Sequence, residues 1–156
     1  MVKRRCVILD RDGVINVRPP EHDYVKSWDE FTLIPAVVDW IHLFNALDLL
    51  VIVVTNQRGV ARGTLTLDAL NDIHTRMREL LAAQRAHIDD ILVCPHDYGE
   101  CQCRKPLPGL VLEAERKWGI DLGASLLIGD SPTDEQLART CGLRFVAVRD
   151  GRIVVR

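Results

Sequence analysis

The chain has 156 residues, 47% of them hydrophobic, which suits one ordinary domain built around a single buried core. Lys and Arg (20) nearly balance Asp and Glu (22), so the formal net charge is only -2 and a nucleic-acid partner is disfavoured. The longest apolar run, 49–54, is too short to cross a bilayer, and no secretory signal follows the basic start. We expect one cytoplasmic, monomeric domain over 1–156 that contacts neither membrane nor nucleic acid.

Short apolar runs rich in Val, Ile or Leu recur along the chain and predict buried strands at 6–9, 49–54, 91–93, 126–128 and 145–148. Amphipathic segments between them predict helices after Pro35, after Thr66, from Pro108 to just before Gly119, and from about Thr133 to Cys141. Alternating strands and helices imply right-handed crossovers. The predicted fold class is therefore α/β, a doubly wound Rossmann-like parallel sheet with helices on both faces.

Two further segments complete the predicted fold. Asp150-Gly151 separates the apolar runs 145–148 and 153–155, a pattern typical of a tight hairpin that adds one antiparallel edge strand. The long irregular stretch 11–34 is a candidate binding loop, because structureless connections of that length are uncommon unless they are functional. We expect no large cap domain.

Polar residues follow three of the predicted strands at their carboxyl ends. Asp10 follows the first strand, Thr55 and Asn56 the second, and Asp130 the fourth. The carboxyl ends of parallel strands meet at one edge of the sheet, where open α/β sheets bind ligands. A single polar residue after a strand means little, but three coincident groups predict a functional site at this edge.

These residue types suit phosphoryl transfer assisted by a metal ion. Asp10 can attack as a carboxylate nucleophile, and Asp12 can exchange a proton with the leaving and attacking oxygens. Carboxylates facing an anionic phosphate would repel it, so a cation is required, and Asp10 and Asp130 supply the hard oxygens that suit Mg²⁺. Lys105 and Thr55 are candidate donors to phosphate oxygens, although a lone Lys is more often simply solvated.

Four ordered motifs spread over nearly the whole chain resemble those of the haloacid dehalogenase-like (HAD) phosphatases. They are Asp10-Arg11-Asp12-Gly13-Val14-Ile15-Asn16, Thr55-Asn56-Gln57, Arg104-Lys105-Pro106 and Gly129-Asp130-Ser131-Pro132-Thr133-Asp134. The resemblance implies Asp10 as nucleophile and Asp12 as general acid/base. It also implies Thr55 and Lys105 on the phosphate, and Mg²⁺ held by Asp10, Asp130 and the Asp12 carbonyl.

Asn56, Gln57 and Arg104 complete the expected phosphate- and substrate-binding set. Asp134 matches an acidic position of the fourth motif, but a negative charge near a helix N-terminus explains it equally well, so we leave it outside the site. A rival hypothesis from another class is a catalytically silent protein that only binds a phosphorylated ligand. The presence of both Asp10 and Asp12 disfavours it.

A cluster of soft ligands precedes the third motif. Five cysteines is an odd number, and three of them crowd beside a histidine, unlike a disulfide framework. Cys94, His96, Cys101 and Cys103 suffice for a closed tetrahedral Zn²⁺ site, which leaves no open position for a water molecule. We therefore expect a structural zinc that staples the loop and directs the residues after Cys103.

This zinc loop narrows the resemblance to the D-glycero-D-manno-heptose-1,7-bisphosphate phosphatases and the related histidinol-phosphate phosphatases. Gly59-Val60-Ala61-Arg62-Gly63 and His22-Asp23-Tyr24-Val25 are similar to the heptose branch, which implies release of the 7-phosphate of a sugar bisphosphate. The four-residue spacer inside the zinc loop and the end of the chain at Arg156 keep histidinol phosphate open as a substrate. Candidate partners for a second phosphate are Arg18, Arg58, Arg62 and Arg104.

Overall fold

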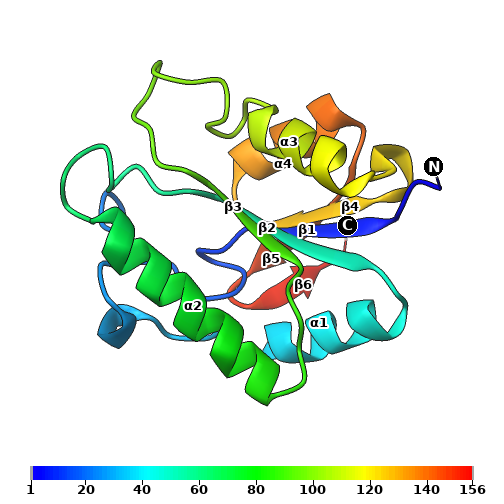
Figure 1. Cartoon of the computed structure of the whole chain (residues 1–156), viewed down its shortest axis with the longest axis horizontal. Coiled ribbons are helices and arrows are strands. Elements are labelled where there is room, and N and C mark those ends of the chain that lie inside the picture. Colours follow the sequence, from blue (N-terminus) through cyan, green and yellow to red (C-terminus); the bar gives the residue numbers. More distant parts are fainter. Residues whose placement is uncertain (1, 156) are drawn as a thin grey trace.

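A computed structural model describes residues 2–155, and its centre is a sheet of six strands (Figure 1). The strands are β1 (Cys6–Leu9), β2 (Leu50–Asn56), β3 (Asp90–Cys94), β4 (Leu126–Gly129), β5 (Arg144–Arg149) and β6 (Arg152–Val154). They lie in the order β3-β2-β1-β4-β5-β6, with only β6 antiparallel to its neighbour among the residues described. The predicted parallel α/β sheet is confirmed.

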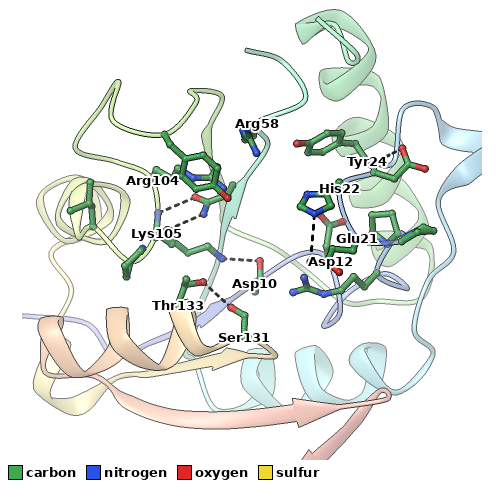
Figure 2. Close-up of a pocket in the computed structure, with 18 of the residues that line it drawn as sticks. Asp10, Asp12, Glu21, His22, Tyr24, Arg58, Arg104, Lys105, Ser131 and Thr133 are labelled. Atoms are coloured by element: carbon green, nitrogen blue, oxygen red, sulfur yellow. Dashed lines mark hydrogen bonds and ion pairs between the residues drawn. The ribbon is translucent and has the colours of Figure 1, made fainter. Parts of the chain in front are cut away.

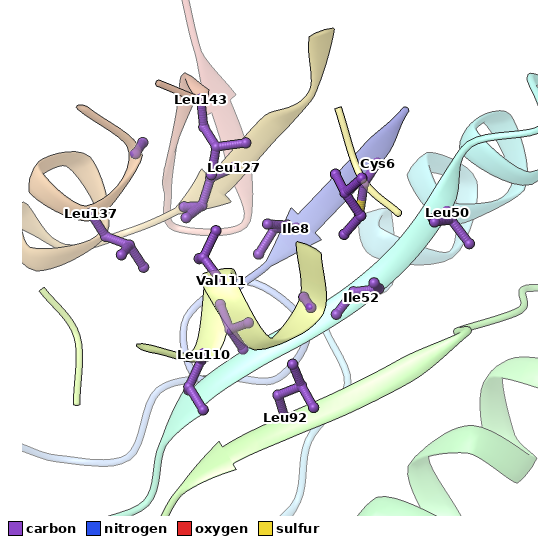
Figure 3. Close-up of a cluster of buried hydrophobic side chains, with 14 of the residues drawn as sticks. Cys6, Ile8, Leu50, Ile52, Leu92, Leu110, Val111, Leu127, Leu137 and Leu143 are labelled. Carbon is purple, nitrogen blue, oxygen red and sulfur yellow. The ribbon is translucent and has the colours of Figure 1, made fainter. Parts of the chain in front are cut away.

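Helices cover both faces of the sheet. They are α1 (Ala36–Ala46), α2 (Leu67–Ala83), α3 (Gly109–Trp118) and α4 (Pro132–Cys141). In Figure 1, α3 and α4 lie on one side of the sheet, and α1 and α2 lie on the other. Alternate residues of β1 divide between these faces, because successive side chains of a strand point in opposite directions. Ile8 packs under α3 and α4 (Figure 3), whereas Val7 and Leu9 pack with α1 and α2.

The helix ends follow the signals read from the sequence. The Thr66 side chain caps α2 by accepting from the Ala69 N–H at 3.1 Å. Gly119 and Gly142 end α3 and α4 in the left-handed conformation, with φ of 65° and 71°. The strands β2 and β3 extend one or two residues beyond their predicted ends, since backbone pairing continues past the apolar run.

The predicted hairpin at Asp150-Gly151 is also confirmed. Both residues have positive φ, 50° and 72°, as a type I′ turn requires, and β6 pairs antiparallel with β5. No helix in residues 2–155 combines the length and apolar character that a membrane span would need. Two short 3₁₀ turns, Trp28–Glu30 and Leu122–Ala124, complete the regular structure of this range.

The long segment 11–34 is half packed and half exposed. Val14 and Ile15 are buried against the α1 side of the sheet, and Asn16 pairs with Leu33 in an isolated bridge. Arg18 and the residues up to Asp23 are instead mostly exposed. The segment is therefore anchored at its base and open at its tip, next to the carboxyl ends of the strands (Figure 1).

We predict that Gly129→Ala disrupts the junction between β4 and α4. A Cβ at this position would lie 2.4 Å from Cβ of Asp134, a side chain that is fully buried and has no room to withdraw. The variant should lose about 1–3 kcal/mol of unfolding free energy, the usual cost of overpacking. Thermal melting measures the loss. Gly123→Ala is the matched control, because the nearest atom to its Cβ is 3.6 Å away, and an unchanged Gly129→Ala melting temperature would contradict the prediction.

Candidate active site

A cavity of about 700 Å³ opens at the carboxyl edge of the sheet (Figure 2). Asp10 and Lys105 lie at its floor, and the tip of the segment 11–34 forms one wall. The opposite wall comes from the segment between β3 and α3, which contributes Arg104 (Figure 2) and, beside it, the Tyr98 ring. Ser131 and Thr133, at the start of α4, line the remaining side. The predicted meeting of the strand ends is confirmed.

Lys105 is a buried ion-pair centre and not a solvated surface lysine. Its Nζ donates to Oδ1 of Asp10 and to Oδ1 of Asp134, each at 2.8 Å, and to the Val54 carbonyl at 3.2 Å. Burial disfavours the charged ammonium, but the two carboxylates outweigh it and raise the pKa of Lys105. Asn56 holds the Lys105 backbone with two hydrogen bonds, one to its carbonyl and one from its N–H. The third motif is therefore tied to the end of β2.

Asp10, Asp130 and Asp134 form a cluster whose ligand oxygens all lie within 4.8 Å of one another. Burial raises the pKa of Asp10, with the negative charges of Asp134 and Asp130 adding to the effect and Lys105 opposing it. Gly13 makes room for this cluster, because a Cβ there would fall 1.8 Å from Oδ2 of Asp130. Three hard oxygens around an excess of negative charge fit a divalent cation such as Mg²⁺.

Asp134, which the sequence analysis left outside the site, lies in this carboxylate cluster. It is fully buried, accepts from Lys105, and forms a capping box with Ser131 at the start of α4. Burial would raise its pKa, but Lys105 and Ser131 outweigh burial and lower it. Asp134 thus lies both in the carboxylate cluster and at a helix N-terminus, the two positions that the sequence analysis weighed as alternatives. Its place in the fourth motif was the signal that could have identified it.

The Asp12 carboxylate is held by donors on both oxygens. Oδ1 accepts from Arg11 and from Asn16, and Oδ2 accepts from Gln57 at 3.2 Å. Burial would raise the pKa of Asp12, but the Arg11 charge and these hydrogen bonds outweigh it and lower the pKa. Gln57 also donates to Thr55 at 2.9 Å and is fully buried. Gln57 thus supports Asp12 and Thr55. The sequence analysis expected it to contact the substrate, but it does not line the cavity.

The predicted arginines have different environments. Arg18 donates from Nε to Oδ2 of Asp130 at 2.8 Å and from Nη2 to Oδ1 at 2.7 Å. The sequence analysis did not predict this pairing. Arg58 and Arg104 each place a guanidinium 4.3 Å from the centre of the Tyr98 ring, at the cavity rim. Nη1 of Arg104 is buried with no hydrogen-bond partner among residues 2–155. Arg62 is exposed and lies outside the cavity.

The four predicted zinc ligands converge. Sγ of Cys94 lies 3.5 Å from Sγ of Cys101 and 3.6 Å from Nδ1 of His96, which is 3.3 Å from Sγ of Cys103. All four atoms are within 4.8 Å of one another. Tetrahedral bonds of about 2.3 Å to sulfur separate ligand atoms by about 3.8 Å, so the cluster fits Zn²⁺. Cys6 is buried on the sheet and is not one of these four ligands.

Comparisons with known proteins agree with this geometry. A family described as HAD-hydrolase-like matches residues 102–153. The D-glycero-beta-D-manno-heptose-1,7-bisphosphate 7-phosphatase of Pseudomonas aeruginosa is 39% identical over 97% of this chain and 84% of its own length. The D-glycero-alpha-D-manno-heptose-1,7-bisphosphate 7-phosphatase of Burkholderia mallei is 37% identical over 91% of this chain and 78% of its own length.

A solved structure is also similar to this chain, in both fold and sequence. It is the D,D-heptose 1,7-bisphosphate phosphatase of Bordetella bronchiseptica in complex with magnesium and phosphate. Its TM-score is 0.87 at 37% identity, over 95% of this chain and 83% of that one. The motifs, the fold and these relatives lead to one assignment: the chain belongs to the heptose-1,7-bisphosphate 7-phosphatase family of HAD-like hydrolases and is a phosphoric monoester hydrolase.

Proposed function

We propose that the protein releases the 7-phosphate of D-glycero-D-manno-heptose 1,7-bisphosphate through an aspartyl-phosphate on Asp10. The observation that carries the proposal is the buried Asp10 carboxylate at the cavity floor. Its Oδ1 accepts from Lys105 and from the Arg11 backbone N–H, both at 2.8 Å. A carboxylate oriented by two donors beneath an open cavity suits attack on a phosphorus atom brought in from above. Relatives named for both anomers leave either anomer compatible with this proposal.

The chemistry proceeds in two balanced steps. A carboxylate oxygen of Asp10 bonds to phosphorus while the bond to the sugar oxygen breaks, and Asp12 gives a proton to that oxygen. Water then attacks the phosphorus, Asp12 takes its proton, and the bond to Asp10 breaks to release phosphate. In the free enzyme Asp12 is ionised, since its pKa is lowered, and an arriving phosphate raises that pKa again through like-charge repulsion.

Positive charge and a metal ion complete the proposed machinery. Lys105, with Thr55 and Asn56 at the end of β2, would stabilise charge on the phosphate oxygens. Asp10, Asp130 and the Asp12 carbonyl would hold Mg²⁺, and Asp134 would steady Lys105 beside it. When bound, the cation neutralises the carboxylates and the phosphate that would otherwise repel each other. The guanidinium of Arg18 must share Asp130 with this cation or move away from it.

We assign the Cys/His cluster to a structural Zn²⁺ and the rim arginines to the second phosphate. The ligands Cys101 and Cys103 come just before the third motif, so a filled cluster would restrict where Arg104 can point. Arg104 has an unused buried donor at the rim, which suits a phosphate oxygen. Reduced thiols in a metal site suit a cytoplasmic protein. We further propose that residues 1–156 act as one domain and as a monomer.

We predict that Asp10→Asn abolishes hydrolysis and leaves the fold intact. The amide keeps the shape of the side chain but cannot attack phosphorus, so the rate should fall at least a thousandfold, as for other lost nucleophiles. Phosphate release is measured beside thermal melting. Asp39→Asn, on the exposed side of α1, is the matched control and should stay fully active. A tenth of the wild-type rate in Asp10→Asn would refute the aspartyl-phosphate.

Purified protein should contain one Zn²⁺ per chain that survives dialysis, unlike the exchangeable Mg²⁺. Elemental analysis without added metal tests this. Cys103→Ser should lose the zinc and melt at a lower temperature, because metal binding contributes to the stability of the loop. Cys141→Ser is the control, since Cys141 lies in α4 away from the cluster and its loss should leave the zinc content unchanged. Folded, active wild-type protein without zinc would disprove the assignment.

Heptose 1,7-bisphosphate should be preferred at least tenfold in kcat/KM over heptose 7-phosphate and over histidinol phosphate, about 1.4 kcal/mol of transition-state binding. Arg104→Ala should erode this preference, because it removes a rim donor, while Arg62→Ala outside the cavity should keep it. Steady-state kinetics on the three substrates provide the measurement. The substrate assignment would be overturned if the enzyme preferred histidinol phosphate, or if Arg104→Ala left the selectivity unchanged. Neither result would contradict the assignment as a phosphatase.

A further inference from the structure

Arg11, between the proposed nucleophile and the proposed acid/base, is the largest of the fully buried side chains described in residues 2–155. A guanidinium is always charged, and burying it is costly unless its donors are satisfied. Neither Asp10 nor Lys105 accounts for it, because none of the hydrogen bonds of its side chain goes to them. Its burial beside the reacting groups therefore needs a separate explanation.

The guanidinium joins the site to helix α2. Nε and Nη2 of Arg11 donate to Oδ1 of Asp12 at 3.2 and 2.8 Å, and Nη1 lies 3.0 Å from Nε2 of His74. The Arg11 carbonyl accepts N–H groups from Val14, Ile15 and Asn16, which folds the loop tightly around it. The loop turn thus holds the Arg11 backbone, while Asp12 and His74 of α2 hold its guanidinium.

His74 is built to accept this hydrogen bond. It lies on the buried side of α2, and burial first, then the nearby Arg11 charge, lowers its pKa to about 3. The Asp12 carboxylate opposes the shift, and Arg78 of the same helix adds to it. The ring is therefore neutral, with Nε2 as the acceptor and the proton on Nδ1, because Arg11 has only donors to offer. Because the His74 ring is neutral, Asp12 is the charged partner of the Arg11 guanidinium.

These contacts distinguish the two oxygens of Asp12. Oδ1 accepts three hydrogen bonds, two from Arg11 and one from Asn16. Oδ2 accepts one long hydrogen bond from Gln57, at 3.2 Å. Asp12 lines the cavity, and its side chain is 21% exposed. The oxygen with spare capacity is Oδ2, which makes it the one that can carry and deliver a proton.

We propose that Arg11 and His74 are a positioning pair for proton transfer: they saturate Oδ1 of Asp12 and keep Oδ2 presented to the substrate. The inference rests on the proposed function and deepens it. Proton delivery matters most when the leaving group is a strong base, such as a sugar alkoxide, and least for a weak base, such as p-nitrophenolate. A fault in positioning should therefore depend on the leaving group, whereas a general loss of folded enzyme should not.

The experiment compares kcat/KM for a sugar bisphosphate and for p-nitrophenyl phosphate, because kcat/KM includes departure of the leaving group. His74→Leu removes the acceptor and should lower kcat/KM at least tenfold on the sugar bisphosphate and less than threefold on the aryl phosphate. His74→Gln retains an acceptor and should recover most of the loss. Met77→Ala is the matched control, a buried cavity mutant one turn along the same helix, and should affect both substrates equally.

Arg11→Lys is a second variant that tests the proposal if the His74→Leu protein does not fold. Lys keeps the charge but lacks the fork, so it should show the same selective loss on the sugar substrate. Equal losses on both substrates, or no loss in either variant, would overturn the positioning pair. Both of those results require an active wild-type enzyme with its Asp10 dependence intact, so they are distinct from failure of the proposed function.

Discussion

The ammonium group of Lys105 lies between the carboxylates of Asp10 and Asp134, 2.8 Å from an oxygen of each. Removing a charge from water is costly, and removing one partner of a buried ion pair leaves an uncompensated charge. The three groups must therefore be buried together or not at all. They come from the end of β1, the start of α4 and the segment before α3, so one ion-pair centre joins three distant parts of the chain. A fourth, the end of β2, joins through Asn56.

The same balance of charge explains why the site fits a cation. Lys105 alone does not neutralise Asp10, Asp130 and Asp134, and Arg18 pairs with Asp130 from the exposed part of the segment 11–34. A divalent ion held by these oxygens would take over that charge and leave Arg18 available to the substrate. The Cys/His cluster would act on the site indirectly, because its last cysteine, Cys103, lies two residues before Lys105. Lys105 would thus connect the two proposed metal sites, because it contacts Asp10 and closely follows the Cys/His cluster.

Asp12 depends on a second, separate network. Its partners reach it from the turn after β1, from the end of β2 and, through Arg11, from α2. The proposed proton-exchanging carboxylate is thereby kept apart from the ion-pair centre that holds the proposed nucleophile. Two carboxylates only two residues apart consequently have opposite pKa shifts, because burial dominates at Asp10 and specific donors dominate at Asp12.

Local patterns in the sequence predict the elements and the chemical groups of the site. Apolar runs, capping residues and the Asp-Gly turn are local signals. Asp10 and Asp130 directly follow strands, Asp12 lies in the first motif and Lys105 in the third. The interaction partners of these groups, in contrast, depend on long-range packing. His74 meets Arg11 across 63 positions, and Arg18 meets Asp130 across 112. Nothing local in a helical histidine or an exposed loop arginine indicates such a contact, because it follows from how the helices and loops pack around the sheet.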